Sequence, residues 1–125
     1  MKKDNKILTI SKSFAIRIIR LFQFLQNEKK GFVLSKQILR SGTSIGANVR
    51  ESEHANSVDD FIYKLSISLK ESNETEYWLE LLYETDYINE KQFQSLISDN
   101  KEITATLIKI IKTTKSGRNS TKEAK

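Results

Sequence analysis

Apolar residues recur at helical spacing along four stretches of the chain, and none of these stretches shows the strict alternation of a β-strand. In the first stretch, residues 5–29, the apolar positions lie three, four or seven apart at Ile7, Phe14, Ile18, Leu21 and Leu25. The other three stretches are residues 36–55, 58–87 and 90–112. Apolar positions at this spacing line one face of a helix. The pattern therefore predicts four amphipathic helices.

Residues suited to capping mark the ends of these helices. Ser35, Ser57 and Asn89 each precede a helical stretch, and their side chains can accept a hydrogen bond from a backbone N–H of the first turn. Asp60, the third residue after Ser57, strengthens that helix start. Gly31 follows two lysines and is expected to end the first helix, because glycine is common just past a helix C-terminus.

Short links between long amphipathic helices predict that neighbouring helices run antiparallel. The predicted fold class is all-α, an antiparallel up-down four-helix bundle that residues 1–115 form as one domain. The remaining residues, 116–125, include no large apolar side chain and are predicted to be a disordered basic tail. A chain of 125 residues, 38% of them hydrophobic, is long enough to bury one core.

The composition excludes several classes of protein. The chain has no cysteine, so disulfide scaffolds and thiolate chemistry are excluded, and a reducing cytoplasmic location is expected. Its basic start is not followed by the pattern of a signal peptide. The apolar stretch at residues 14–25 is interrupted by Arg17 and Arg20, so it does not suit a membrane span.

The charges are segregated along the chain although the net charge is only +5. Residues 1–50 carry 11 Lys and Arg against 2 Asp and Glu, residues 51–100 carry 3 against 12, and residues 101–125 carry 7 against 2. Such segregation indicates either an electrostatic partner or ion pairing between the segments of one protomer.

Small residues gather in the second and third predicted helices. A glycine within a helix costs about 1 kcal/mol relative to alanine, so Gly42 and Gly46 imply a compensating close contact. The third helix has large residues such as Phe61, Leu65 and Leu79 at the ends of its apolar stripe and small residues in the middle. In a hairpin that turns near residue 56, the small residues of the two helices meet. The sequence therefore predicts that the second helix, with Ser41 and Ile45 also on its inward side, packs on the third through its glycines.

Polar residues near the end of the second helix are candidates for a binding site. Asn48 lies on an inward track, where an asparagine more often fixes the register of a bundle than binds a ligand. Glu51 and His54 resemble the Glu-x-x-His pair of di-iron bundles, but such a site needs a second pair, and the chain has one histidine. No metal site and no cofactor are therefore predicted. No nucleophile with its base and no phosphate-binding loop is recognisable, so neither enzyme activity nor a small-molecule substrate is expected.

The predicted hairpin also brings a basic residue of the second helix close to acidic residues of the third. Arg40 lies level with Glu71 and Glu74 in this arrangement. We favour ion pairing within the protomer over a ligand site, because such pairs are common on the surfaces of helical bundles.

Two of the predicted helices have apolar residues outside their core stripe. These residues are Ile16 and Phe24 in the first helix, and Tyr63, Ile67, Trp78 and Leu81 in the third. Single exposed apolar residues are common, but a contiguous patch usually marks association. These residues therefore predict a homo-oligomer with its interface on these faces.

Two segments are distinctive, QILRSGTSIGANVRES at residues 37–52 and DFIYKLSISLKESNETEYWLELL at residues 60–82. With these segments, the second and third helices closely resemble the bacterial four helix bundle protein family, whose members are encoded in intervening sequences of 23S rRNA genes. The matching positions are Gln37, Ser41, Ser44, Ile45, Asn48 and Glu51 in the second helix, and Phe61, Leu65, Glu71, Glu74, Trp78 and Leu79 in the third. With Ser13, Phe14 and Ile19, the resemblance covers most of residues 10–112.

This resemblance implies a four-helix bundle that assembles into a closed homo-oligomeric ring, five-fold in the relatives, without enzyme activity. It also implies a relation to the accessory variability determinant of diversity-generating retroelements, a basic ring that binds nucleic acid and a reverse transcriptase. The present chain departs from that protein in its acidic third helix and its modest net charge.

Two functions remain open at this point. In the first, an oligomer binds RNA or DNA without sequence preference, through phosphate contacts from its basic helices. The candidate contact residues are Lys12, Arg17, Arg20, Lys36, Arg50, Lys109 and Lys112. In the second, the protein is an assembly scaffold whose basic segments pair with the acidic third helix. The two functions differ in whether these cations form one free surface after assembly.

Overall fold

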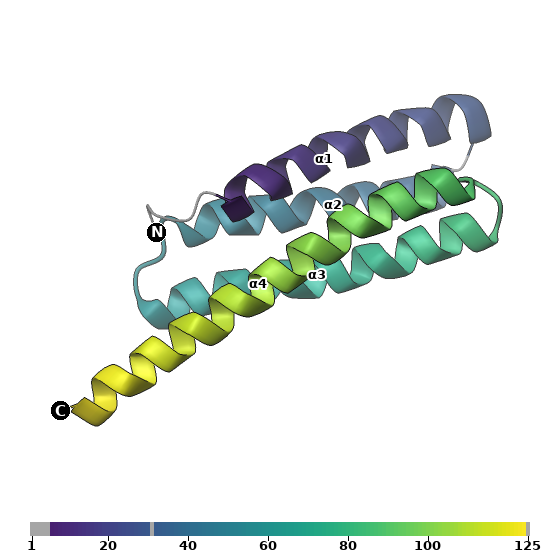
Figure 1. Cartoon of the computed structure of the whole chain (residues 1–125). Coiled ribbons are helices and arrows are strands. Elements are labelled where there is room, and N and C mark those ends of the chain that lie inside the picture. Colours follow the sequence, from purple (N-terminus) through teal and green to yellow (C-terminus); the bar gives the residue numbers. More distant parts are fainter. Residues whose placement is uncertain (1–5, 31, 125) are drawn as a thin grey trace.

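The computed structural model describes residues 6–30 and 32–124, and the regular structure in these residues is helical (Figure 1). The four long helices are α1 (Lys6–Phe24), α2 (Phe32–Ser52), α3 (Val58–Glu84) and α4 (Glu90–Ala124). A short π-helical segment, η1 (Leu25–Lys29), extends α1. The prediction of an all-α protein with four helices is confirmed. Among the described helices, none combines the length and the apolar character of a membrane span.

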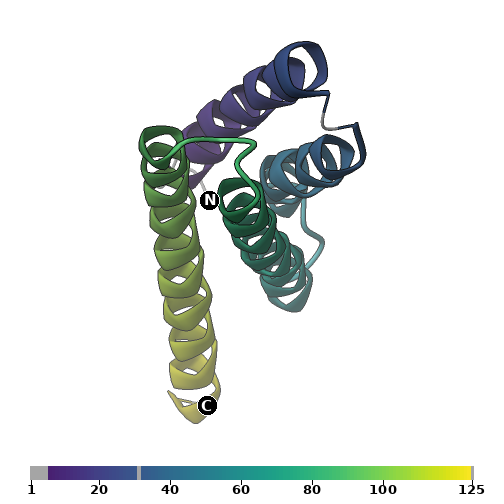
Figure 2. The same ribbon diagram turned by 90° about the vertical axis from the view of Figure 1, so that its right-hand side faces the viewer.

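The core lies between helices that pack on their neighbours in the chain. Each helix contacts the next, and α1 also contacts α4, although less extensively (Figure 2). Phe14 of α1, Ile45 of α2, Leu65 and Leu79 of α3, and Leu107 of α4 are at most 1% exposed. Each of these residues belongs to the apolar stripe of its helix, so the spacing in the sequence predicts the buried faces correctly.

The two glycines of α2 face α1. A Cβ atom at Gly42 would lie 2.8 Å from Cγ1 of Ile18, and one at Gly46 would lie 3.3 Å from the carbonyl oxygen of Ser11. The prediction that these glycines pack on the third helix is therefore wrong. The close approach that they allow is the one between α1 and α2.

The contact between α2 and α3 is made by residues one position before each glycine. Oγ1 of Thr75 lies 2.9 Å from Oγ of Ser41, and the hydroxyl of Ser68 donates to the carbonyl oxygen of Ile45 at 2.9 Å. Successive residues of a helix point about 100° apart, so the next position belongs to the neighbouring side of the helix. The small residues of α3 do face α2, as predicted, but they meet Ser41 and Ile45.

Two of the predicted helix caps are confirmed. The hydroxyl of Ser57 accepts a hydrogen bond from the backbone N–H of Asp60 at 3.0 Å, at the start of α3. At the start of α4, the Asn89 side chain accepts from the backbone N–H of Gln92, and the Gln92 side chain accepts from the backbone N–H of Asn89, both at 2.8 Å. This reciprocal pair is a capping box, which fixes where α4 begins.

The link between α1 and α2 differs from the prediction. Ser35 is not an N-cap, because α2 already begins at Phe32 and Ser35 is a fully buried residue of its first turns. Its hydroxyl accepts a hydrogen bond from the Gln26 side chain at 2.8 Å, so tertiary packing uses the group that suggested a cap. The predicted end at Gly31 lies outside the described residues. Lys30 has the left-handed conformation, with φ 53°, and its N–H donates to the carbonyl oxygen of Leu25.

Helix α4 extends well past the predicted end near residue 112. It continues to Ala124, so the backbone of residues 116–124, assigned from the sequence to a disordered tail, is helical in the structure. No proline interrupts this stretch. Figure 1 shows the end of α4 projecting beyond the other three helices, which explains why the sequence there lacks an apolar stripe.

Candidate nucleic-acid interface

A charged cluster on the outer side of α2 and α3 confirms the predicted pairing of Arg40. Its guanidinium lies 3.2 Å from Oε1 of Glu71 and also contacts Oε2 of Glu74. The indole N–H of Trp78 donates to the same Glu74 oxygen at 3.0 Å. This hydrogen bond from Trp78, together with the neighbouring Arg40, lowers the pKa of Glu74 below its ordinary value. The hydrogen bond to Glu74 raises the pKa of Arg40.

We expect Glu74→Gln to weaken the protein at neutral pH and to have little effect in acid. A carboxylate with a lowered pKa in the folded state stabilises the fold above its unfolded pKa, ordinarily 4.5, and that contribution is lost as pH falls through the folded pKa. The side chain is 32% exposed, so the loss should be limited to about 1 kcal/mol. Urea unfolding at neutral pH and at about pH 3 measures both values.

Glu84→Gln is the control for this experiment, because Glu84 is an exposed residue of the same helix without an ion pair to any residue that the structure describes. It should change stability by no more than about 0.5 kcal/mol at either pH. Equal behaviour of the two variants at neutral pH would contradict a stabilising role for the cluster.

Other family-motif residues lie along the same side of α2. Gln37, Ser44 and Glu51 recur every seven residues, almost two helical turns, and therefore follow one line. The Ser44 hydroxyl donates to the carbonyl oxygen of Arg40 at 2.6 Å, and the Asn48 side chain donates to the carbonyl oxygen of Ser44 at 2.9 Å. Asn48 thus forms its hydrogen bond within its own helix. This bond does not fix the register between helices, which is the role that the sequence predicts.

The buried asparagine that does cross between helices is Asn100, which the sequence analysis missed. It is fully buried in α4, and its amide donates to the carbonyl oxygen of Ser72 in α3 at 3.0 Å. Its own carbonyl oxygen has no hydrogen-bond partner among the described residues. The signal was present in the sequence, because Asn100 falls between Ile97 and Ile103 on the apolar stripe of α4.

Among the residues that the structure describes, Lys6, Arg17 and Arg40 form ion pairs inside the protomer. Lys6 lies 3.5 Å from Glu102, and Arg17 lies 2.7 Å from Asp99; both acids belong to α4. Arg17 also donates to the hydroxyl of Ser95 at 2.9 Å. Arg40 is the third, so within the described residues the acidic helix α3 takes part in ion pairs through Arg40. The basic first helix pairs instead with α4.

Six of the seven candidate contact residues make no ion pair with any residue that the structure describes. They are Lys12, Arg20, Lys36, Arg50, Lys109 and Lys112, and all six are exposed. Arg20 has a hydrogen bond with the Gln23 side chain at 3.3 Å. These cations are therefore free to contact a partner, whereas Arg17 is already engaged.

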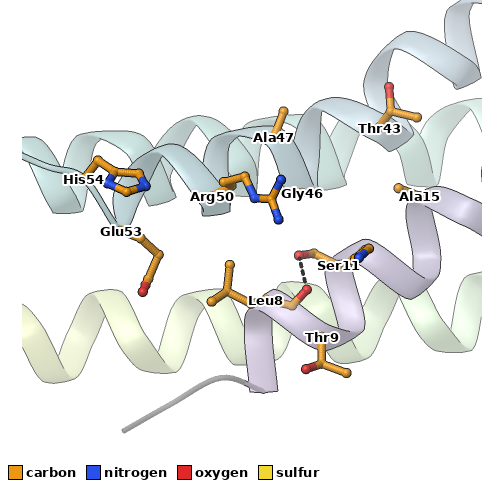
Figure 3. A pocket seen from close by; sticks show the side chains of 11 residues that line it. Leu8, Thr9, Ser11, Ala15, Thr43, Gly46, Ala47, Arg50, Glu53 and His54 are labelled. Carbon is orange, nitrogen blue, oxygen red and sulfur yellow. Dashed lines mark hydrogen bonds between the residues drawn. The ribbon is translucent and has the colours of Figure 1, made fainter. Parts of the chain in front are cut away.

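A groove between α1 and α2 brings two of these cations together (Figure 3). Its volume is about 460 Å³. It is lined by Leu8, Thr9, Ser11, Lys12 and Ala15 of α1, by Thr43, Gly46, Ala47 and Arg50 of α2, and by Glu53 and His54 at one end. We call this hollow the α1–α2 groove. Glu51, the predicted companion of His54, is not part of its lining.

A second hollow, of about 370 Å³, lies between α1 and α4. Arg17 and Arg20 line it together with Ile16, Phe24 and Leu96. Lys36, Lys109 and Lys112 line neither hollow. Within one protomer, four of the seven candidate cations thus line two hollows in pairs, and the other three belong to neither.

The candidate interface residues differ in their exposure. Tyr63 is 59% exposed and Ile16 is 50% exposed, as an interface residue of an isolated protomer should be. Ile67 and Leu81 are half-buried, and Phe24 and Trp78 pack partly against the core. The sequence analysis missed Tyr77, which is 55% exposed and whose ring centroid lies 5.4 Å from that of Trp78.

Comparisons with known proteins point to one protein family. Residues 3–109 match a family model described as 23S rRNA-intervening sequence protein. A solved structure of a protein of unknown function from the S23 ribosomal protein family of Bacteroides thetaiotaomicron is similar, with 60% sequence identity and a TM-score of 0.84. The alignment covers 85% of this chain and 98% of that chain. Among curated proteins, none matches.

Proposed function

The chain belongs to the 23S rRNA-intervening sequence protein family, and on that premise we propose that it is a non-enzymatic bundle that binds RNA or DNA without sequence preference. The observation that carries this proposal is the set of six exposed candidate cations without an ion pair to any residue that the structure describes. Free lysine and arginine side chains can neutralise phosphates and release counterions, which supplies most of non-specific nucleic-acid affinity.

The alternative function, an assembly scaffold, requires the basic segments to pair with the acidic helix α3. In the described residues, Arg40 pairs with Glu71 and Glu74 of α3, whereas Arg17 and Lys6 pair with α4. Among the residues that the structure describes, the six unpaired candidate cations therefore lack the partner on α3 that this alternative needs. Nucleic-acid binding explains the free charge better.

The proposal includes self-association as an up-down bundle in a closed homo-oligomeric ring, of five protomers by family resemblance, in the cytoplasm. Its support is the exposure of Tyr63 and Tyr77 on the outer side of α3 and of Ile16 on α1. Repetition of one protomer around a ring also repeats each pair of cations. Several weak phosphate contacts would then act together on one strand.

Fluorescence anisotropy with a labelled single-stranded RNA and a labelled DNA duplex tests the proposal. We expect binding at roughly 50 mM salt, and log Kd should rise linearly with log salt, with a slope of about 0.7 for each phosphate contacted on single strands and about 0.9 on duplex. Arg20→Glu combined with Lys109→Glu should weaken binding to both probes by at least about tenfold, because two phosphate contacts become repulsive.

Lys91→Glu combined with Lys101→Glu is the matched control. Both lysines are exposed, neither is a candidate contact residue, and the change in net charge is the same. Affinity should stay within about threefold of the wild type. Absence of binding at low salt, or equal losses in the two double variants, would refute the proposed contacts.

A further inference from the structure

The α1–α2 groove owes its existence to short side chains. Helix α2 approaches the backbone of α1 closely at Gly46, and Ala15, Thr43 and Ala47, all with short side chains, line the groove beside this contact. Longer side chains at these positions would cover the contact. The resulting hollow of about 460 Å³ falls in the size range of pockets for small ligands, which runs from roughly 300 to 1,000 Å³.

Opposite walls of this groove supply positive charge. Lys12 comes from α1 and Arg50 from α2, and neither has an ion pair with any residue that the structure describes. Figure 3 shows the guanidinium of Arg50 turned along the groove towards Gly46, and the carboxylate of Glu53 reaching from the end of α2 towards the start of α1. Glu53 is the acid in the lining, and His54 lies beside it. The two cations are therefore available to an anion from outside.

The rest of the lining combines apolar side chains with the hydroxyl groups of Thr9, Ser11 and Thr43. Leu8, Ala15 and Ala47 offer an apolar surface next to the two cations. A bare inorganic anion would use the charges and leave this surface in water. A nucleotide can use both the two cations and the apolar surface. Its phosphate suits the planar fork of an arginine, and its sugar and base can cover apolar side chains.

We propose that the α1–α2 groove holds one nucleotide of a bound strand, with the phosphate between Lys12 and Arg50 and the sugar and base against Leu8, Ala15 and Ala47. This inference rests on the proposed nucleic-acid binding and adds a defined site to it. It distinguishes the groove from the other exposed cations, which contact phosphates without enclosing a nucleotide.

Substitution of two alanines tests the site. Ala47 lines the groove, and Ala105 of α4 lines neither of the two hollows; both are exposed residues within helices, so the same substitution should be equally compatible with folding at each. In anisotropy titrations with single-stranded RNA, Ala47→Glu should bind at least about tenfold more weakly than Ala105→Glu. Ala47→Leu should also bind more weakly than Ala105→Leu, because it fills the groove without changing charge.

A second experiment uses mononucleotides as probes. Adenosine and uridine monophosphate, at millimolar concentration with the isotopically labelled full chain, should shift the amide resonances of Ala15, Gly46 and Ala47 and leave that of Ala105 in place. Lys12→Gln should reduce these shifts, whereas Lys101→Gln, at an exposed position of α4, should not. Circular dichroism melting confirms that every variant is folded.

The outcomes separate this inference from the proposed function. If RNA binds the wild type but Ala47→Glu and Ala105→Glu bind equally well, the groove site is wrong and nucleic-acid binding stands. If mononucleotides shift the groove residues but neither RNA nor DNA binds, the groove is a site for a free nucleotide, and both the proposed function and the site for a bound strand are wrong. If poly-glutamate shifts the same residues as strongly as the nucleotides do, the groove accepts acidic chains in general and the nucleotide assignment is overturned. If neither RNA nor a mononucleotide binds, both are wrong.

Discussion

Replacement of Gly46 by leucine should lower the thermal midpoint of unfolding by roughly 10 °C or more. The first added atom would lie 3.3 Å from the carbonyl oxygen of Ser11, which belongs to the backbone of α1 and cannot rotate away. The remaining atoms of the leucine would therefore push α1 off α2. Overpacking of this kind costs about 1–3 kcal/mol or more, against a total stability of about 5–15 kcal/mol for a small domain.

The next residue in the chain provides a matched control for this variant. Ala47→Leu adds the same side chain one position along α2, at an exposed site that faces the α1–α2 groove. Its midpoint should stay within a few degrees of the wild type, because surface substitutions rarely change stability by more than about 0.5 kcal/mol. Differential scanning calorimetry of the two variants decides the matter. An unchanged midpoint for Gly46→Leu would refute a close contact at this glycine.

The sequence predicts the role of these glycines but not their partner. Two helical glycines require a close contact, and that inference holds. Which helix the glycines face depends on how α2 is rotated about its own axis, and a rotation of less than 100°, the angle between successive residues, changes the partner. Periodicity alone does not determine this rotation when small residues lie next to one another in the sequence. Here Ser41 and Ile45 face α3, and Gly42 and Gly46 face α1.

Local signals were reliable where the chemistry is local. Ser57 and Asn89 cap their helices because each bonds a backbone N–H three residues away. Ser35 has the same type of side chain, but its hydroxyl is used by Gln26 of the preceding helix, and the sequence holds no local sign of that distant bond. The Arg40 pairs were predictable because a hairpin fixes which positions of adjacent helices lie level.

The candidate site was only partly predictable. The sequence shows the sign of the charge on each helix. Whether Arg17 is free or paired with Asp99 depends on how α1 lies against α4. The α1–α2 groove was not predicted, because its hollow comes from the absence of large side chains at Ala15, Thr43 and Ala47. Periodicity in a sequence reveals apolar stripes, but it does not reveal a space that side chains leave unfilled.

Tyr63→Asp should convert the protein from a homo-oligomer to a monomer. Tyr63 is 59% exposed on the outer side of α3 and lies two heptads before Tyr77, which is 55% exposed, so both rings follow one line along the helix. In the proposed ring this line is buried against a neighbouring protomer. An aspartate there would be buried without a partner and would oppose association strongly. Light scattering at micromolar concentration should give about five times 14.5 kDa for the wild type and about 14.5 kDa for the variant.

Ile108→Asp is the control, because Ile108 is an exposed apolar residue of α4 at 38% exposure and lies outside the candidate interface. This variant should keep the mass of the wild type. A monomeric Tyr63→Asp should also bind RNA about 100-fold more weakly while it keeps its free cations, since linked contacts gain affinity from one another. A wild type that is monomeric at micromolar concentration, or a ring that survives Tyr63→Asp and dissociates with Ile108→Asp, would show that the outer side of α3 is not the interface.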